Sequence, residues 1–230
     1  MPTESVTLEY YFDPFCGWCY ASAPALDALA EAYPQTLRMR PSGLFANTGG
    51  QPVSSMAEHS WRTGQRIATM TGQTYTTEYR DRVLHNPDGI FDSIYPTRAI
   101  MALGEIDHLL EPKLLHALQT ARDIDGKDTS RAEVVAPIAA EVAGLQGHKI
   151  EAAAFAERLV KDQALARRTD ATMQTTVEDM RALSGTGVPQ LLVVVGDHCE
   201  VVDGADLYGG GARVLRAIDA VMTRAAVDVH

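Results

Sequence analysis

The sequence predicts an α/β protein in which a long block of helices separates two segments that contain strands. Three observations support this prediction. The chain begins with a strand, a helix and a strand, reads as helical almost throughout from residue 52 to about residue 183, and ends with two strands and a helix. Clusters of glycine and proline mark both borders of the helical block. The predicted order is therefore β–α–β, a helical block, and β–β–α.

The first strand and the first helix meet at a pair of cysteines, Cys16 and Cys19. Before the pair, apolar residues alternate with other residues, which predicts a strand. After it, apolar residues recur every three or four positions up to Tyr33, which predicts an amphipathic helix. Pro24 has no backbone N–H for the carbonyl of Tyr20, so we expect it to kink this helix rather than end it.

The remaining elements follow from periodicity and from capping residues. A second strand is predicted at residues 36–40. The main helices of the block are expected to begin near Pro96, Pro112, Ser130 and Asp162. Ser130 and Glu133 have the spacing of a capping box. The strands predicted near the C-terminus, at 190–195 and 199–202, form a hairpin, and the final helix follows three glycines at 209–211.

The position of the two cysteines predicts redox chemistry. The first N–H groups of a helix lack partners and carry the positive end of its dipole, so a thiolate there has a pKa below the roughly 8.5 of a free cysteine. We expect Cys16 to be exposed and to attack, and Cys19 to be shielded and to resolve the mixed disulfide. A structural zinc site would need two further ligands, and Cys199 has no partner at a common chelating spacing. We therefore favour a redox pair and expect no metal.

Composition and charge limit the classes of function. The chain has 230 residues and a net charge of −10, whereas nucleic-acid binding needs clustered lysine and arginine. Three cysteines are too few for a scaffold held by disulfides. No segment approaches the roughly 18 apolar residues of a membrane span, and residues 1–5 show no sign of a signal peptide. We expect a cytoplasmic protein that binds neither nucleic acid nor membrane.

Two motifs together resemble the DsbA family of the thioredoxin superfamily. They are the cysteine pair at a strand–helix junction and Gly187-Val188-Pro189 at the opening of a late strand, with a helical insertion between them. Residues 13–20 are similar, more narrowly, to the leaderless FrnE-like branch of predicted protein-disulfide isomerases. The resemblance covers the whole chain in element order. It implies a thioredoxin fold with a large all-helical insertion (DsbA-like), in which residues 1–46 and 185–230 form a discontinuous domain and residues 47–184 form the insertion.

The resemblance implies a thiol–disulfide oxidoreductase or disulfide isomerase with Cys16 as nucleophile and Cys19 as resolving thiol. Val188–Pro189 would be a cis peptide that faces the cysteines, and the backbone of Val188 would pair with the substrate. Trp18 would either contact the substrate or cover the active-site helix. The expected cofactor is none beyond the redox-active disulfide, with glutathione as a candidate reductant. The expected partners are protein or peptide thiols and disulfides, and the chain would be a monomer or a homodimer.

The sequence also departs from the superfamily pattern at two places. Many thioredoxin-fold oxidoreductases carry a buried acid six residues before the nucleophile, where this chain has Tyr10. Glu9 is adjacent but should face the other side of the strand, so no carboxylate relay to Cys19 is expected. The dipeptide between the cysteines is Gly-Trp and not the Pro-His of strongly oxidising members, so we expect a less extreme reduction potential.

Two other classes of function stay open. Glutathione-dependent isomerases and transferases of the 2-hydroxychromene-2-carboxylate isomerase and kappa-class types share this architecture, but their active position is usually a serine without the second cysteine. A non-catalytic peptide-binding chaperone would use the helical block as a groove. His59, Trp61 and Arg62 are weaker candidates for residues that overhang the cysteines. The glycines at 209–211 either bind an anion or, more often, form a tight turn. Cys199 is expected to be a bystander.

Overall fold

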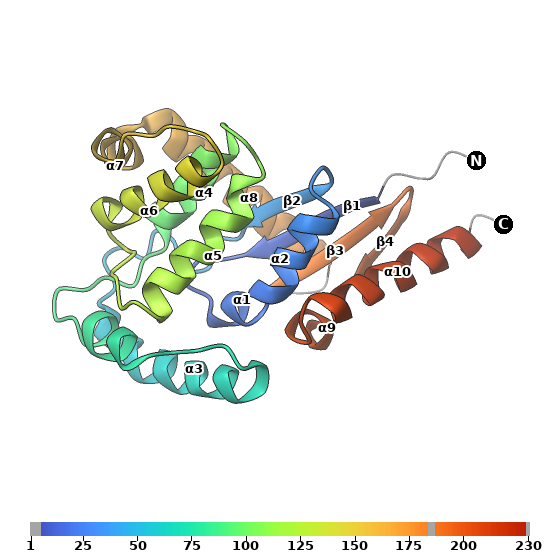
Figure 1. Ribbon diagram of the computed structural model, residues 1–230, viewed down its shortest axis with the longest axis horizontal. Helices are drawn as coiled ribbons and strands as arrows, with labels where there is room; N and C mark the ends of the chain where they lie inside the picture. Colours follow the sequence, from blue (N-terminus) through green and yellow to red (C-terminus); the bar gives the residue numbers. More distant parts are fainter. Residues whose placement is uncertain (1–5, 184–186, 229–230) are drawn as a thin grey trace.

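The computed structural model describes residues 6–183 and 187–228. The predictions for residues 1–5 and for the glycine-containing turn at 185–186 lie outside the described residues. A four-stranded mixed sheet in the order β2-β1-β3-β4 forms the centre of the molecule (Figure 1). Its strands come from both ends of the chain, and the helices between β2 and β3 form the predicted helical block. The predicted α/β class with a helical insertion is confirmed.

The strands are β1 (Val6–Phe12), β2 (Leu37–Pro41), β3 (Gln190–Val195) and β4 (His198–Val201). β1 runs parallel to β2 and antiparallel to β3, and β3 pairs antiparallel with β4. In this register Tyr10 lies opposite Met39 on one side and Leu191 on the other. Tyr10, Tyr11 and Phe12 are all fully buried, because β1 is a central strand that is covered on both faces.

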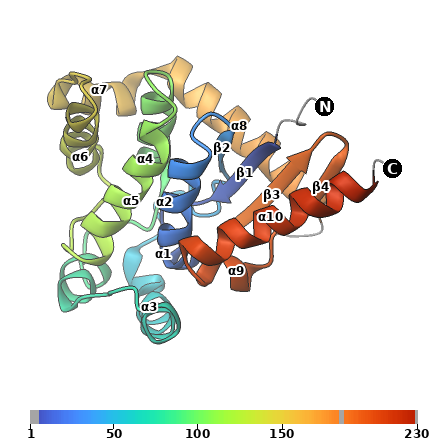
Figure 2. The same ribbon diagram turned by 45° about the vertical axis from the view of Figure 1, so that its right-hand side comes forward.

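The helices lie around the sheet and at one end of it (Figures 1 and 2). Their bounds are α1 (Gly17–Ala21), α2 (Ala23–Ala32), α3 (Ala57–Thr71), α4 (Ile94–Gly104), α5 (Leu110–Asp123), α6 (Ala132–Leu145), α7 (Ala152–Lys161), α8 (Gln163–Ala182), α9 (Gly204–Tyr208) and α10 (Gly211–Asp228). A short 3-10 helix (Val53–Ser55) and a π-helix (Tyr79–Leu84) complete the described elements. Helices α2 and α10 pack side by side against the sheet, α8 runs along β2, and α4–α7 stand together at one end.

The first predicted helix is divided at Ser22 into α1 and α2. The expectation of a single kinked helix is therefore wrong, because the backbone of Ser22 (φ −93°, ψ 6°) leaves the helical region. Pro24 has no N–H to donate to the carbonyl of Tyr20, as predicted. That carbonyl instead accepts a hydrogen bond of 2.8 Å from Nε2 of Gln73, a residue of the helical block.

The predicted capping box before α6 does not form. The Ser130 hydroxyl donates to Oδ1 of Asp128 at 2.6 Å, and Arg131, not Ser130, occupies the N-cap position. Glu133 pairs with the Arg131 side chain. The serine and the glutamate have the spacing of a capping box, but the serine hydroxyl donates to the Asp128 carboxylate in the preceding turn and not to the helix.

Other helix boundaries differ from the prediction by small steps. Helices α4 and α5 each begin two residues before the predicted prolines, Pro96 and Pro112, which fit inside the first turn because its N–H groups need no helical partner. The start of α8 after Asp162 is confirmed, and the Asp162 carboxylate caps it by accepting from the backbone N–H of Leu165 at 3.0 Å. The short helix α9, between β4 and the three glycines, was not predicted.

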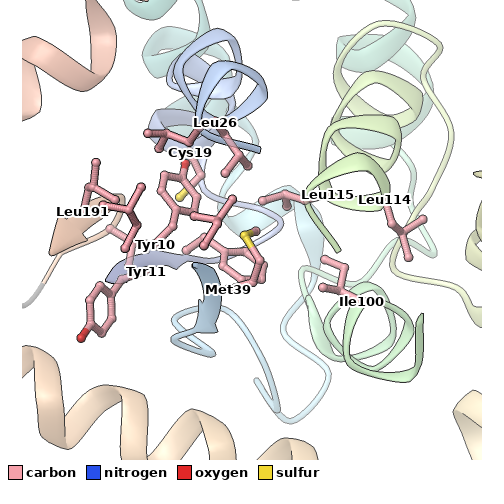
Figure 3. Packing of buried hydrophobic residues seen from close by; sticks show 14 of the residues in the cluster. Tyr10, Tyr11, Cys19, Leu26, Met39, Ile100, Leu114, Leu115 and Leu191 are labelled. Atoms are coloured by element: carbon pink, nitrogen blue, oxygen red, sulfur yellow. The ribbon is translucent and has the colours of Figure 1, made fainter. Parts of the chain in front are cut away.

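One hydrophobic core joins the sheet to the helical block. Figure 3 shows Tyr10 and Met39 of the sheet in the same cluster as Ile100 of α4 and Leu115 of α5, while Tyr11 points to the opposite side of β1. The predicted boundaries of the two domains stay a prediction. Within the described residues, no helix combines the length and the apolar character needed to cross a bilayer.

Candidate active site

The two cysteines lie at the junction of β1 and α1, and both are free thiols. Cys16 occupies the N-cap position of α1 and is 7% exposed, whereas Cys19 is completely buried. Cys16 is thus the more accessible thiol, but the expectation that it is exposed is wrong. The reason is its packing against the segment before β3, where its Sγ donates a hydrogen bond of 3.3 Å to the carbonyl oxygen of Val188. The Val188–Pro189 peptide bond is cis.

The surroundings of the two sulfurs give them opposite acidities. The nearby Cys19 thiol, together with the backbone amides of Cys19 and Trp18, lowers the pKa of Cys16 against the effect of burial. Burial, reinforced by the neighbouring Cys16, raises the pKa of Cys19 well above its usual value. Cys16 is therefore the thiol that ionises first, and Cys19 keeps its proton.

A pair of hydroxyl groups occupies the place of the buried acid found in many thioredoxin-fold enzymes. The hydroxyls of Tyr10 and Ser22 lie 2.6 Å apart, and Ser22 also donates to the backbone carbonyl of Cys19 at 3.0 Å. Figure 3 shows Tyr10 and Cys19 in the same part of the core. Glu9 faces the other side of β1, where it accepts a hydrogen bond of 2.6 Å from Tyr11. A neutral hydroxyl pair therefore takes the position of that acid on β1.

Asp13 is a buried acid that the sequence did not single out. Its carboxylate is fully buried and accepts from the backbone N–H of Phe15 (2.9 Å), the backbone N–H of Phe45 (3.0 Å) and the hydroxyl of Ser93 (3.0 Å). Burial raises its pKa, and these three hydrogen bonds oppose the rise. The carboxylate ties the loop that carries Cys16 to two other segments of the chain.

We expect Asp13→Ala to lower the free energy of unfolding by about 3 kcal/mol, because each buried donor left without a partner costs about 1–3 kcal/mol. Urea unfolding followed by circular dichroism measures the change. Ser93→Ala is the matched control: it removes one donor and leaves the carboxylate paired, so its effect should be about 1 kcal/mol. If the two variants lose equal stability, the carboxylate does not hold the loop.

Trp18 packs between two side chains beside the cysteines. Its ring lies 5.0 Å from the ring of Tyr208, and the guanidinium of Arg66 lies 5.7 Å from its centroid. Trp18 also lines a cavity next to Cys16. The indole therefore covers α1 and leaves part of its surface in that cavity, so both predicted roles stay compatible with the structure.

Of the three weaker candidates in the helical block, His59 alone lines the cavity next to Cys16. Trp61 lies under the guanidinium of Arg80, 5.3 Å from its ring centroid, and Arg62 is exposed and pairs with Glu58. Arg66, one turn beyond Arg62 on α3, was missed, and its position on the same face of the helix as His59 was the signal available.

The three glycines before α10 have a packing role. Gly210 has a φ of +82°, and a Cβ at Gly211 would lie 2.7 Å from Cβ of Ala28 on α2. The run therefore allows α10 to approach α2 closely, which agrees with its predicted use as a tight turn. Cys199 is exposed on β4, an edge strand that β3 separates from β1.

A cavity of about 260 Å³ lies next to Cys16. One wall carries Cys16, Gly17 and Trp18, and the others carry side chains of the helical block: Met56, His59, Ser60, Thr63, Arg66, Tyr75, Tyr79, Phe91 and Asp123. Tyr75 joins these walls, because its hydroxyl donates to the carbonyl of Gly17 at 3.3 Å. A Cβ at Gly17 would lie 3.0 Å from that hydroxyl, so the glycine allows the contact.

The fold and the site together define a class of protein. A four-stranded sheet whose central strand leads into a Cys-x-x-Cys helix, with a more acidic outer thiol beside a cavity and a buried inner thiol, is typical of a thiol–disulfide oxidoreductase. Among the described residues, no group of three or more histidine, cysteine or acidic side chains is arranged to hold a metal ion.

The chain belongs to the DSBA-like thioredoxin domain family, whose sequence profile matches residues 7–209. This match confirms the predicted family and the thioredoxin fold with a helical insertion. No curated protein sequence matches the chain significantly.

Several solved structures have the same fold. The cytosolic disulfide reductase DsbM from Pseudomonas aeruginosa is 26% identical over 97% of this chain and 98% of its own, with a TM-score of 0.73, and its structure with GSH superposes with a TM-score of 0.71. A protein from Nitrosomonas europaea, provisionally described as a protein disulfide isomerase, is 18% identical over 96% and 99% of the two chains, with a TM-score of 0.70. A 2-hydroxychromene-2-carboxylate isomerase is 16% identical over 97% and 99%, with a TM-score of 0.55, and shows the shared fold alone.

Proposed function

We propose that this protein reduces or isomerises disulfides in the cytoplasm through the Cys16–Cys19 dithiol. The observation that carries the proposal is the inequality of the two thiols. Cys16 has a lowered pKa and lies at the wall of a cavity, while Cys19 is completely buried and has a raised pKa. A nucleophile must ionise and be accessible to its substrate, whereas a resolving thiol must stay protonated until the mixed disulfide has formed.

The reaction follows from this arrangement. The Cys16 thiolate attacks one sulfur of a substrate disulfide, and the other sulfur leaves as a thiolate. Cys19 then loses its proton to a departing thiolate and attacks Cys16, which releases the second substrate thiol and leaves a Cys16–Cys19 disulfide. The Val188 carbonyl, which now accepts from the Cys16 thiol, loses this donor when Cys16 ionises. Val188, Pro189 and Trp18 would then contact the substrate chain.

A thiol of the cell must reduce the Cys16–Cys19 disulfide to complete a cycle, and we propose glutathione. The structure of DsbM with GSH supports this choice, and the description of DsbM as cytosolic supports the cytoplasm as the location. The cytoplasmic glutathione pool, at about −220 to −320 mV, favours reduced dithiols, so reduction or isomerisation is preferred over oxidation. No further cofactor enters the proposal. Protein and peptide disulfides are the proposed substrates, and the chain acts as a monomer or a homodimer.

Reduction of insulin by glutathione tests the proposal. The reduced protein should accelerate precipitation of the insulin B chain, and a parallel assay of glutathione conjugation to an aromatic halide should show no activity. The opposite result, conjugation without reduction of insulin, would favour the glutathione-transferase class that shares this fold. Binding of unfolded peptide with neither activity would favour a chaperone.

A further inference from the structure

The cavity beside Cys16 contains a buried carboxylate, Asp123, that forms no hydrogen bond or ion pair with the described residues. Asp123, the last residue of α5, is 7% exposed, and within residues 6–183 and 187–228 no hydrogen bond or ion pair reaches its side chain. Buried carboxylates in proteins are normally paired, because an isolated buried charge is costly. Asp123 lines the same cavity as Cys16. A cationic group in this cavity would supply the missing partner.

The charge of the neighbouring Arg122 favours ionisation of Asp123, so the carboxylate is compensated in part. The guanidinium of Arg122 stacks on the ring of Phe15, 3.8 Å from its centroid, and forms no ion pair with the adjacent Asp123 in the part of the chain described. The cavity is also lined by the aromatic rings of Tyr75, Tyr79 and Phe91, and the Arg122 guanidinium lies 5.8 Å from the Tyr79 centroid and 5.7 Å from the Phe91 centroid. Aromatic faces around a carboxylate form a favourable site for an organic ammonium group.

The size and position of the cavity restrict the ligand. A volume of about 260 Å³ lies just below the roughly 300–1,000 Å³ of typical small-molecule sites, so the cavity holds a compact group. Cys16 lies in the wall of the same cavity, so a ligand that reacts with its thiol must carry this compact group close to its own sulfur atom. His59 and Arg66 also line the cavity and suit a carboxylate on the same ligand.

We propose that this cavity is a subsite for amine-bearing thiols of low molecular weight, in which Asp123 binds the ammonium group while the ligand sulfur reaches Cys16. The inference rests on the proposed function. In a single turnover, the reduced protein and one disulfide RSSR give the Cys16–Cys19 disulfide and two thiols RSH, so two electrons and two protons pass from the protein to the ligand and no other reductant takes part.

The test uses symmetric alkyl disulfides that end in an amine, with two to six carbons between nitrogen and sulfur, and their hydroxyl and carboxylate counterparts. Pre-reduced protein is mixed with each disulfide, and the rate is followed by the intrinsic tryptophan fluorescence. We expect Asp123→Asn to raise the half-saturating concentration about tenfold or more for the amine of best-fitting length. The hydroxyl counterpart should change less than about twofold, and the carboxylate counterpart should bind better.

Asp125→Asn is the matched control, because it removes the same charge two residues away from an exposed side chain that pairs with Lys127. It should leave the whole series unchanged. If amine and hydroxyl disulfides respond alike to Asp123→Asn at every chain length, the subsite does not exist. If neither series oxidises the reduced wild-type protein, the proposed function fails instead, so the two failures are distinguishable.

Discussion

Replacing Cys16 with serine is expected to lower the rate of disulfide reduction by about a thousandfold or more, since a serine hydroxyl does not ionise at neutral pH and cannot form the mixed disulfide. Replacing Cys19 with serine should also stop turnover, but at a later point. Cys16 would still attack, and no second thiol would release the bound substrate. The two variants thus lose the same activity for different reasons.

The difference is visible on non-reducing gels and by mass spectrometry. Cys19→Ser should accumulate a covalent adduct that dithiothreitol removes, and Cys16→Ser should accumulate none. Both variants are best made in a Cys199→Ser background, because Cys199 is exposed and would trap substrate by itself. Adducts on the Cys16→Ser variant in that background would exchange the two assigned roles.

Asp123→Asn is expected to stabilise the folded protein, by on the order of 4 kcal/mol at pH 8. Burial raises the pKa of Asp123 from its ordinary 3.8 to about 7, although the charge of Arg122 works in the other direction. Between these two values the folded chain holds a proton that the unfolded chain has released. Asp123 therefore makes its full contribution to the free energy of unfolding below about pH 3.8. This contribution is lost as the pH rises through 7, by about 1.4 kcal/mol for each pH unit.

Urea unfolding of the wild type and of Asp123→Asn between pH 5 and 8 isolates this effect, because asparagine has the same shape and does not titrate. The nearby phenols of Tyr20, Tyr75 and Tyr79 have raised pKa values owing to burial, so they stay neutral throughout this range. The difference between the two proteins should widen up to about pH 7 and then level off, because above that pH Asp123 is ionised in both the folded and the unfolded chain. A constant difference would mean that Asp123 is already ionised at pH 5 and has a partner in solution.

The sequence was sufficient to locate the thiols, because every step of that inference is local. The period of two before Cys16, the helical period after Cys19 and the i, i+3 spacing each involve neighbours in the chain. The same holds for the start of α8, which depends on Asp162 and the next few residues. Family resemblance added the role of the Val188–Pro189 segment, which no local pattern indicates.

The remaining parts of the site depend on contacts between distant segments. Asp13 precedes the cysteines as an ordinary turn residue, and its burial follows from donors on Phe45 and Ser93. Asp123 ends an amphipathic helix, where the sequence alone predicts a solvated charge. Only the folded structure places it in the wall of the cavity. The prediction of a capping box at Ser130 failed for a local reason, since the carboxylate of Asp128, two residues earlier, accepts the hydrogen bond of the serine.

The hydrogen bonds from Gln73 to the carbonyl of Tyr20 and from Tyr75 to that of Gly17 make the insertion a structural support of the active-site helix. A shortened protein without the segment between β2 and β3 would keep the Cys-x-x-Cys sequence, yet two carbonyls of α1 would lose their side-chain donors. Substitutions at positions 73 and 75 can therefore alter the alignment of the thiols without any change in the motif itself. Sequence differences among such proteins at positions 73 and 75, in the loop after α3, should therefore be compared as well as those between the cysteines.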